Sequence, residues 1–340
     1  MEYKNKSILI TGGTGSLGYA LTEYFLKNHP ELERLIIFSR DEQKQFKMAQ
    51  LYPPDVFKQI RFFIGDVRDK DRLIRAINQV DYVIHAAAMK HVPIAEYNPN
   101  ECIKTNVGGA QNLIEACLSA SSCVSRVVAL STDKACAPIN LYGATKLTSD
   151  KMFVAANNFS GKKDIKFSVV RYGNVFGSNG SVVPYFLKMM KKGVLNITDK
   201  SMTRFNISIE GGVEMVINAL ENAWGGELFV PKIPSYRITD LATAICEKCK
   251  IKIIGIRPGE KVHEEMISSS DSYNSYDLGK YYVILPTRLK WNLSKFIKEF
   301  KAIKIPKGFS YNSGKNDEWL DIKQLKKLID KNPSHDFDIF

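Results

Sequence analysis

Short apolar runs and amphipathic stretches alternate along the first half of the chain. The apolar runs include "SILIT", "RLIIFS", "IRFFI", "YVIH", "RVVALST" and "KFSVVRY", and stretches with helical periodicity such as "GYALTEYFLKN" separate them. Strands that are apolar throughout and that alternate with helices are typical of a parallel sheet covered on both faces. The pattern predicts an α/β fold with a doubly wound parallel sheet.

The regular alternation ends near residue 174, after which short helices are mixed with loops. We therefore expect a first domain over residues 1–173, to which some later segments return. Residues 174–340 are expected to form mainly a smaller C-terminal cap and a tail. A final short helix is predicted to begin near Trp319.

Composition excludes several classes of protein. Hydrophobic residues make up 44% and charged residues 25% of the 340 positions, which is ordinary for a globular protein with a buried core. The longest apolar runs have the length of strands, so no membrane span is expected. The N-terminus "MEYKNKSILITGG" enters a strand without an apolar segment of signal-peptide length, and we expect a cytoplasmic protein.

The six cysteines are expected to be reduced thiols, as is usual in the cytoplasm. Cys246 and Cys249 form a CxxC inside the helical-looking stretch "DLATAICEKCK". A closed zinc site needs about four ligands, and no second pair or nearby histidine completes one. We therefore expect a plain helix and no metal.

The formal net charge of +12 raises the question of an anionic partner. A basic surface suits nucleic acid, anionic lipid or an anionic small substrate. The lysines are not interleaved with aromatic residues in a nucleic-acid-binding module, so we expect solvated surface charge and no nucleic-acid partner.

A glycine-rich turn follows the first apolar run, in "ILITGGTGSLGYAL". Such a turn lets the backbone approach a pyrophosphate at a helix N-terminus, where N–H groups and the helix dipole favour anions. Glycines alone indicate only a tight turn, but their place between a strand and a helix predicts a Rossmann-like dinucleotide site. The expected contacts are Gly12, Thr14, Gly15, Ser16, Leu17 and Gly18.

The second strand ends in "IIFSRDEQK". An acid at this point would bind a ribose 2′-hydroxyl and select NAD. Here Ser39 and Arg40 come first, with Asp41, Glu42 and Lys44 behind them, and an arginine can pair with a 2′-phosphate. We therefore expect NADP, with NAD or a merely solvated loop as the alternatives.

Further cofactor contacts are expected at the ends of the next two strands. Asp66 and Val67 follow the third strand, where an adenine ring would lie, and the small residues Ala86, Ala87 and Ala88 end the fourth. His85 is interpreted as a packed histidine rather than a catalyst. Lys90 and Asn106 complete the set of expected cofactor contacts.

Tyr142 and Lys146 are four residues apart and would share one face of a helix. A tyrosine of ordinary pKa is a poor base at neutral pH, but a nearby ammonium and an oxidised nicotinamide favour the phenolate. The pair can then take a proton from a substrate hydroxyl that Thr132, at the end of the fifth strand, also binds.

The motifs now resemble those of the extended short-chain dehydrogenase/reductases. More narrowly, "TGGTGSLG", "FSRDEQKQ", "HAAAMKHVP", "STDKA", "NLYGATK", "RYGNVFGSNGSVVP", "MTRFNI", "GIRPGEKVHEEM" and "YNSGKNDEWL" resemble inverting UDP-N-acetylglucosamine 4,6-dehydratases. The resemblance implies the first step of pseudaminic acid synthesis, a pathway that serves flagellin glycosylation. It also implies a homo-oligomer, for which a hexamer is one candidate.

The resemblance gives roles to Asp133 and Lys134. Oxidation at C4 of the sugar acidifies the C5 proton, water is eliminated across C5 and C6, and hydride returns to C6. The product is a UDP-2-acetamido-2,6-dideoxy-hexos-4-ulose. By analogy Lys134 is the C5 base and Asp133 the C6 acid, so Lys134 should be partly neutral and Asp133 should keep its proton through burial. A surface ion pair is the plain alternative.

A UDP-sugar needs cations and hydrogen-bonding groups in the cap. Arg204 and Arg257 are expected at the diphosphate, because a guanidinium suits phosphate oxygens. Val183 and Pro184 are expected beside the uracil, and Glu260 at the ribose hydroxyls. The remaining expected substrate contacts are Lys90, Asn174 and Thr203.

Two other functions stay open. A UDP-sugar epimerase or reductase of the same superfamily would use Tyr142 and Lys146 and leave Asp133 and Lys134 idle. A non-catalytic NADP-binding regulator would need neither pair.

Overall fold

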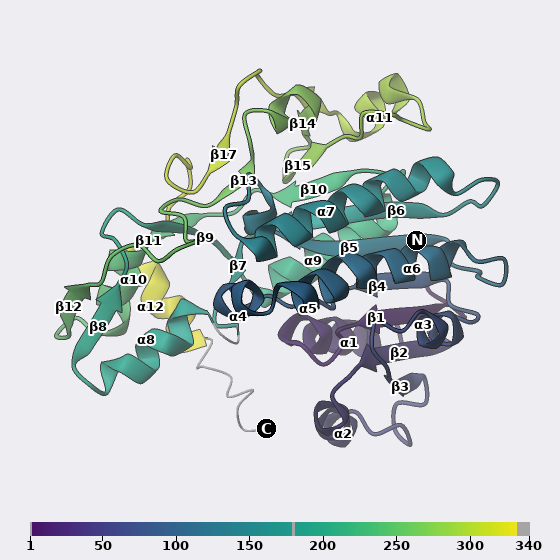
Figure 1. Cartoon of the computed structure of the whole chain (residues 1–340), viewed down its shortest axis with the longest axis horizontal. Helices are drawn as coiled ribbons and strands as arrows, with labels where there is room; N and C mark the ends of the chain where they lie inside the picture. Colours follow the sequence, from purple (N-terminus) through teal and green to yellow (C-terminus); the bar gives the residue numbers. More distant parts are fainter. Residues whose placement is uncertain (1, 179–180, 332–340) are drawn as a thin grey trace.

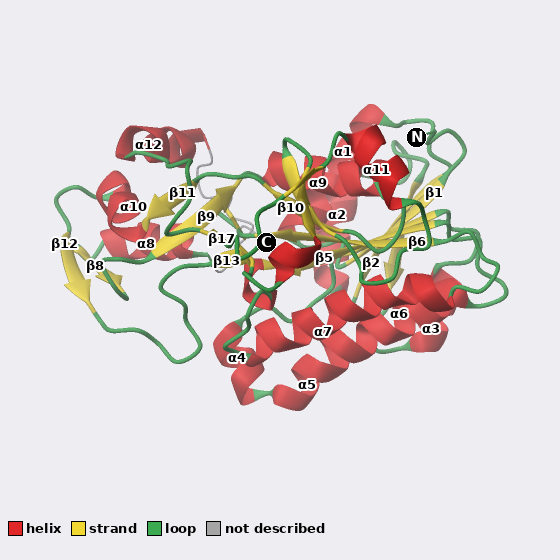
Figure 2. Ribbon diagram, turned by 90° about the horizontal axis from the view of Figure 1, so that it is seen from above, coloured by secondary structure: helices red, strands yellow, loops and turns green. Residues whose placement is uncertain are grey.

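A computed structural model describes residues 2–178 and 181–331 of the chain. Positions 179–180 of the motif "RYGNVFGSNGSVVP" and the last nine positions of the expected C-terminal tail lie outside these residues. The centre of the molecule is a ten-stranded sheet with neighbouring helices on both faces (Figure 1, Figure 2).

Seven neighbouring strands of this sheet are parallel, in the order β3-β2-β1-β4-β5-β6-β10. Their bounds are β1 (Ser7–Thr11), β2 (Arg34–Ser39), β3 (Ile60–Ile64), β4 (Tyr82–His85), β5 (Arg126–Thr132), β6 (Lys166–Tyr172) and β10 (Leu228–Pro231). The order reverses at β1, as in a doubly wound sheet, which confirms the predicted fold class.

Three antiparallel strands extend the sheet beyond β10, and the sequence pattern did not indicate them. They are β14 (Ser275–Asp277), β15 (Tyr281–Ile284) and β16 (Ile303–Lys304). The link between β14 and β15 is a tight turn containing Gly279 at φ +84°. It is too short for a helical crossover, so the two strands must run antiparallel.

Each face of the sheet carries its own core, because successive side chains of a strand point to opposite faces. In β1, Leu9 packs on one side, whereas Ile8 and Ile10 pack on the other. One face is covered by α3 (Lys70–Ala76), α4 (Val92–Tyr97), α5 (Pro99–Ile103), α6 (Gly109–Leu118) and α7 (Leu141–Ala156), with a π-helical turn over Lys104–Gly108. The other carries α1 (Ser16–Asn28), α2 (Glu42–Leu51), α9 (Ile209–Asn222) and α11 (Leu293–Phe300).

The cap lies beside the carboxyl ends of the parallel strands (Figure 1). It has a third core of buried side chains. Its strands are β7 (Asn174–Val175), β8 (Val194–Ile197), β9 (Thr203–Ile207), β11 (Ser235–Arg237), β12 (Lys250–Ile253), β13 (Glu265–Ile267) and β17 (Tyr311–Asn312). Its helices are α8 (Val182–Met190), α10 (Ile238–Ile245) and α12 (Ile322–Lys331). The chain crosses between cap and sheet repeatedly, since α9 packs on the sheet, and β10 and β14 to β16 are strands of it.

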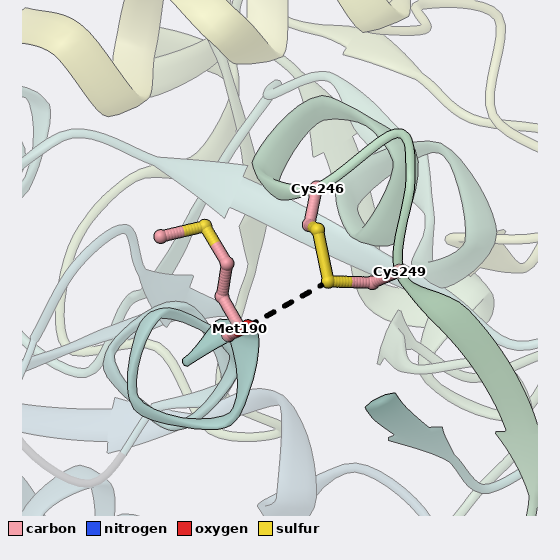
Figure 3. The surroundings of a disulfide bond; sticks show 3 residues. All are labelled: Met190, Cys246 and Cys249. Atoms are coloured by element: carbon pink, nitrogen blue, oxygen red, sulfur yellow. Dashed lines mark hydrogen bonds between the residues drawn. A yellow bond between two sulfur atoms is a disulfide. The ribbon is translucent and has the colours of Figure 1, made fainter. Parts of the chain in front are cut away.

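The expectation for Cys246 and Cys249 was wrong, because the two form a disulfide (Figure 3). Helix α10 ends at Ile245, and the chain turns so that the N–H of Cys249 donates to the carbonyl of Cys246 at 3.3 Å. The turn brings the two Cα atoms to 5.4 Å, within the range that a disulfide spans. The bridge faces Met190 at the end of α8.

Among the helices within residues 2–178 and 181–331, none is both long and apolar enough to cross a bilayer.

Candidate active site

The glycine-rich turn connects β1 to α1 and has the geometry of an anion site. Gly12 has φ +67°, and a Cβ atom there would lie 2.7 Å from the backbone nitrogen of Ala87. A Cβ at Gly18 would lie 2.2 Å from the carbonyl oxygen of Gly13, so only glycine lets the helix start so close to the turn. Helix α1 begins after Gly15 without a side-chain cap, which leaves its first N–H groups for an anion. This cradle, whose other predicted residues are Thr14, Ser16 and Leu17, fits a dinucleotide pyrophosphate.

Of the residues at the end of β2 and just after it, some make hydrogen bonds within the protein and others are exposed. Ser39 Oγ accepts a hydrogen bond from Gln45, and Asp41 caps α2 by accepting from the N–H of Lys44. Arg40 is 55% exposed and lies 3.6 Å from the carboxylate of Asp66. Arg40 thus borders the expected cofactor site, with Glu42 in the first turn of α2.

Asp66 is held by cations. Burial opposes its ionisation, but hydrogen bonds from Arg68 and the charges of Arg68 and Arg40 keep the pKa of Asp66 below its usual value. Val67 is buried against Gly109 of α6. Both residues therefore lie at the end of β3, where the sequence placed them.

The end of β4 faces the glycine turn through Ala86 and Ala87, and Ala88 is exposed. His85 is buried and its Nδ1 lies 2.8 Å from Thr11 Oγ1, so the interpretation as a packed histidine is confirmed. Asn106 has a structural role, because its side chain bonds both the N–H and the carbonyl of Met89 and donates to Thr145. It thereby fixes the segment that carries Lys90.

The chemical groups predicted from the sequence meet at the end of β5. Thr132 Oγ1 donates to Asp133 Oδ1 at 2.9 Å, and Lys134 Nζ donates to the same oxygen at 3.1 Å. The Tyr142 hydroxyl hydrogen-bonds the Thr132 side chain. A Cβ at Gly143 would lie 2.1 Å from the carbonyl oxygen of Lys134, so the glycine next to Tyr142 lets α7 pack on this turn.

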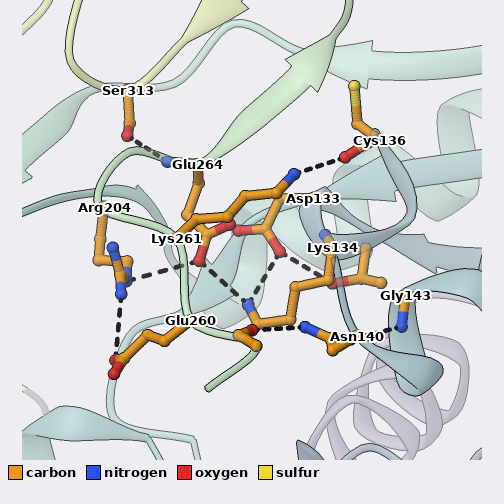
Figure 4. A network of polar contacts seen from close by, with 12 residues as sticks. Asp133, Lys134, Cys136, Asn140, Gly143, Arg204, Glu260, Lys261, Glu264 and Ser313 are labelled. Carbon is orange, nitrogen blue, oxygen red and sulfur yellow. Dashed lines mark hydrogen bonds and ion pairs between the residues drawn. The ribbon is translucent and has the colours of Figure 1, made fainter. Parts of the chain in front are cut away.

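The cap is tied to the same turn (Figure 4). Asn140 caps α7 through the N–H of Gly143 and donates to the carbonyl of Gly259, each at 2.8 Å. Lys261 donates to the carbonyl of Cys136 at 2.6 Å. The loop 257–264 is therefore fixed against the turn that follows β5 and against the start of α7.

Glu264, at the end of this loop, was not singled out from the sequence. Its Oε1 lies 3.4 Å from Lys134 Nζ and 3.6 Å from Arg204 Nε (Figure 4). Arg204 also pairs with Glu260 at 3.4 Å. Glu264 lies 130 positions from Lys134, and only its place in the motif "KVHEEM" marked it.

The expected lowering of the Lys134 pKa was wrong for this structure. Burial acts to lower the pKa, but the carboxylates of Asp133 and Glu264 outweigh it, and the pKa of Lys134 is raised. The sequence could not show that a second carboxylate from the cap reaches this amine.

The other two catalytic candidates are both buried. Burial raises the pKa of Tyr142 to about 12, while Lys134 and the hydrogen bond with Thr132 act against this rise. Burial lowers the pKa of Lys146, which Asp150 opposes. Lys134 is the cation with the largest effect on the pKa of Tyr142 in this structure.

A cavity of about 380 Å³ opens between this turn and the cap. Of the expected substrate residues, it is lined by Asn174, Val183, Arg204, Arg257 and Glu260, together with the newly found Glu264. Pro184 and Thr203 are not among its lining residues, and Thr203 Oγ1 bonds His263 and Ser313 instead.

Lys90 lies near Lys134. Partial burial of its amine and the charge of Lys134 lower the pKa of Lys90, although the residue as a whole is exposed. A second cavity of about 450 Å³ lies at the opposite end of β6, around Lys166 and Trp224, and contains none of the predicted site residues. In the described ranges, no three His, Cys, Asp or Glu side chains gather as metal ligands would.

A parallel sheet with a dinucleotide turn after β1 and a Tyr-x-x-x-Lys pair beside the end of β5 defines an extended short-chain dehydrogenase/reductase. The chain belongs to the family described as "Polysaccharide biosynthesis protein", whose family model matches residues 8–286.

Two curated relatives match nearly the whole chain. "UDP-N-acetylglucosamine 4,6-dehydratase (inverting)" of Campylobacter jejuni serotype O:2 is 54% identical over 339 residues, which cover 96% of this chain and 98% of the relative. "UDP-glucose 4-epimerase" of Rickettsia akari is 40% identical over 336 residues, with 96% of each covered.

Solved structures agree with the fold. Pen from Bacillus thuringiensis has a TM-score of 0.87 and 34% identity, with 98% of this chain and 100% of that chain covered. DesIV from Streptomyces venezuelae, a dTDP-glucose 4,6-dehydratase with NAD bound, has a TM-score of 0.65 at 22% identity and covers 75% of this chain and 86% of its own. At that identity DesIV supports the fold alone.

Proposed function

We propose that the protein is an inverting UDP-N-acetylglucosamine 4,6-dehydratase, a hydro-lyase that uses a nicotinamide dinucleotide. The observation that carries the proposal is the convergence of Thr132, Asp133, Lys134 and Tyr142 at one strand end beside a cavity. An oxidation site alone would need only the tyrosine, the lysine of its helix and the threonine. The neighbouring acid and amine supply what an elimination requires in addition.

Each side chain has a distinct role in this proposal. Tyr142 accepts the proton of the C4 hydroxyl, and Thr132 holds that hydroxyl by a hydrogen bond. For the elimination, the proton that Lys134 Nζ shares with Asp133 Oδ1, 3.1 Å away, lies on Asp133, which leaves the amine neutral. Lys134 then takes the proton from C5, and Asp133 gives its proton to the departing C6 hydroxyl. The dinucleotide, when bound, supplies a hydride acceptor for C4 and a hydride donor for C6. Reprotonation of C5 from the opposite face inverts that centre.

The dinucleotide is proposed to be NADP. The support is the exposed Arg40 guanidinium after β2, at the position where a 2′-phosphate would lie. The glycine turn from Gly12 to Gly18 would hold the pyrophosphate, and Asp66 and Val67 would lie beside the adenine.

The cavity is proposed to bind UDP-N-acetylglucosamine. Arg257 is exposed at its wall and is the better placed of the two arginines for the diphosphate, because Arg204 is engaged by Glu260 and Glu264. Asn174 would bind the sugar or a phosphate, and Val183 would pack against the uracil. Pro184, Thr203 and Glu260 keep their expected substrate roles only as weaker candidates, since the structure gives them other partners or places.

We further propose that the protein acts in the cytoplasm as a homo-oligomer. The step would be the first of pseudaminic acid synthesis, with flagellin glycosylation as the end use. The support for these points is the resemblance of the motifs and the function named for the Campylobacter relative.

Mass spectrometry of the nucleotide sugar tests the proposal. After incubation of the purified protein with UDP-N-acetylglucosamine and no added reductant, we expect the loss of one water, about 18 mass units, because the cofactor is regenerated in each cycle. A 4-epimerase is the second candidate, favoured by the Rickettsia relative. It would leave the mass unchanged while altering the sugar configuration.

A further inference from the structure

Glu264 is a buried carboxylate whose backbone is held in place by hydrogen bonds. Its side chain is 3% exposed, and its N–H donates to Ser313 Oγ at 2.9 Å. The N–H of Ser313 donates back to the Glu264 carbonyl at 2.8 Å, and Ser313 Oγ lies 2.7 Å from Thr203 Oγ1. The backbone before β13 is thus fixed to both β17 and β9, so the carboxylate has little freedom to move away.

The two oxygens of this carboxylate have different surroundings. Oε1 lies between Lys134 Nζ, at 3.4 Å, and Arg204 Nε, at 3.6 Å. Oε2 is buried and has no hydrogen-bond partner within residues 2–178 and 181–331. Burying a charged group costs free energy unless cations and hydrogen bonds compensate it. A buried carboxylate with one oxygen lacking a partner therefore lowers the stability of the fold, so stability does not explain its presence.

Lys134 is held from two sides. Asp133 Oδ1 lies 3.1 Å from its amine and Glu264 Oε1 lies 3.4 Å from it, and Figure 4 shows the amine between them. Asp133, Glu264 and Arg204 are the charged groups that act most strongly on the amine. Its own charge in turn acts on Lys90, Tyr142 and Tyr236. Asp133 and Glu264 are the two carboxylates that form ion pairs with it.

We propose that Glu264 is a positioning residue for the elimination: it fixes the Lys134 amine beside Asp133 and sets the pH range in which that amine can act as a base. The inference rests on the proposed function for its catalytic meaning. The effect of Glu264 on the charge of Lys134 does not depend on that function, because the ion pair exists in the protein without substrate.

The sign of the effect follows from the charges. A carboxylate beside an ammonium favours the charged form, so Glu264 makes Lys134 a base only at higher pH. Glu264→Gln keeps the shape of the side chain and removes the charge. The neutral fraction of Lys134 at a given pH should therefore rise.

Acylation of lysines by a small anhydride measures this fraction without any substrate, since only the neutral amine reacts. At a fixed, mildly alkaline pH, we expect Lys134 in Glu264→Gln to be acylated about tenfold faster than in the wild type, which corresponds to a fall of about one pKa unit. Glu265→Gln is the matched control: Glu265 is the next carboxylate and bonds Ser310 rather than Lys134. Peptide mass spectrometry gives the rate at Lys134.

The kinetic counterpart is the pH dependence of water loss from UDP-N-acetylglucosamine. The limb on which kcat/KM rises with pH should move to lower pH in Glu264→Gln by the same amount, with KM at the optimum changed less than threefold. An acylation rate equal to that of the wild type, or a limb that stays in place while the rate falls, would overturn the proposal.

The outcomes separate this inference from the proposed function. If wild-type protein removes no water, the function fails while the acylation result still decides the electrostatic role of Glu264. If Glu264→Gln does not fold, Glu264→Asp is used instead, because the shorter side chain moves the carboxylate away from the Lys134 amine by the length of one methylene. Faster acylation of Lys134 in that variant supports the proposal, and an unchanged rate overturns it.

Discussion

The amine of Lys134 lies 3.1 Å from a carboxylate oxygen of Asp133, its immediate neighbour in the chain. Adjacent residues rarely meet in this way in a strand, where their side chains point to opposite faces. Here β5 has ended at Thr132, and the following 3₁₀ turn over Asp133–Ala135 brings both side chains together. An acid and an amine are thereby placed beside the hydroxyls of Thr132 and Tyr142.

Replacement of Lys134 separates the two halves of the proposed reaction. In Lys134→Ala we expect the C4 hydroxyl still to be oxidised, seen as reduced nicotinamide in single-turnover absorbance. Water loss should fall about 10²–10⁴-fold, since a general base is missing. Lys162→Ala, an exposed lysine outside the site, is the control. Equal loss of both steps in Lys134→Ala would contradict this division of roles.

Arg257 should act mainly on binding. Arg257→Ala removes an exposed guanidinium from the cavity wall, and the loss of a charged hydrogen bond to phosphate should raise KM about tenfold, with a smaller change in kcat. Arg237→Ala is the matched control, because Arg237 is an exposed cap arginine that pairs with Asp240. Steady-state kinetics that show equal KM values for the two variants would argue against a diphosphate contact.

The buried His85 predicts a pH dependence of stability. Burial, with a smaller contribution from the charge of Lys146, lowers the pKa of His85 from 6.5 to about 3. Below pH 6.5 the histidine binds a proton in the unfolded chain but stays neutral in the folded chain. The free energy of unfolding therefore falls as the pH falls toward 3. The loss approaches about 1.4 kcal/mol per pH unit.

Urea unfolding at several pH values measures this loss. The free energy of unfolding of His85→Gln should fall less steeply between about pH 6 and about pH 4 than that of the wild type. His29→Gln, a half-buried histidine that pairs with Glu31 and packs against Tyr3, serves as the control. Parallel curves for the wild type and His85→Gln would show that His85 does not carry the effect.

The disulfide of the cap should contribute modestly to stability. A bridge that closes a loop of about four residues is worth about 2 kcal/mol in the chain-entropy account. We expect a reductant to lower the free energy of unfolding of the wild type by this amount and to leave the Cys246→Ser/Cys249→Ser variant unchanged. Alkylation of both thiols in the native, unreduced protein would instead show that the bridge is absent.

The sequence predicted well those parts of the site that are local in the chain. The glycine turn at Gly12–Gly18 and the helix that carries Tyr142 and Lys146 each lie within a single strand–turn–helix unit. The spacing of these residues in the sequence therefore determines how they lie relative to one another. The parallel sheet was equally visible, because strands buried on both faces are apolar throughout.

The parts that were missed depend on contacts between distant segments. No periodicity relates Glu264 to Lys134, and the pairing arises only because loop 257–264 is bonded to the start of α7 and the turn before it. The raised pKa of Lys134 follows from that contact and could not be foreseen. The bridge between Cys246 and Cys249 depended on where α10 ends, and helix ends are the least certain feature of a sequence pattern.

The central claim is that a hydride is removed from C4 of the sugar and returned to C6 of the same molecule. UDP-N-acetylglucosamine with deuterium at C4 tests it directly, with NMR and mass spectrometry of the product. The account predicts a product that has lost one water and carries the deuterium on C6, without any added reductant. Deuterium that stays at C4, or that is lost to the medium, would contradict it.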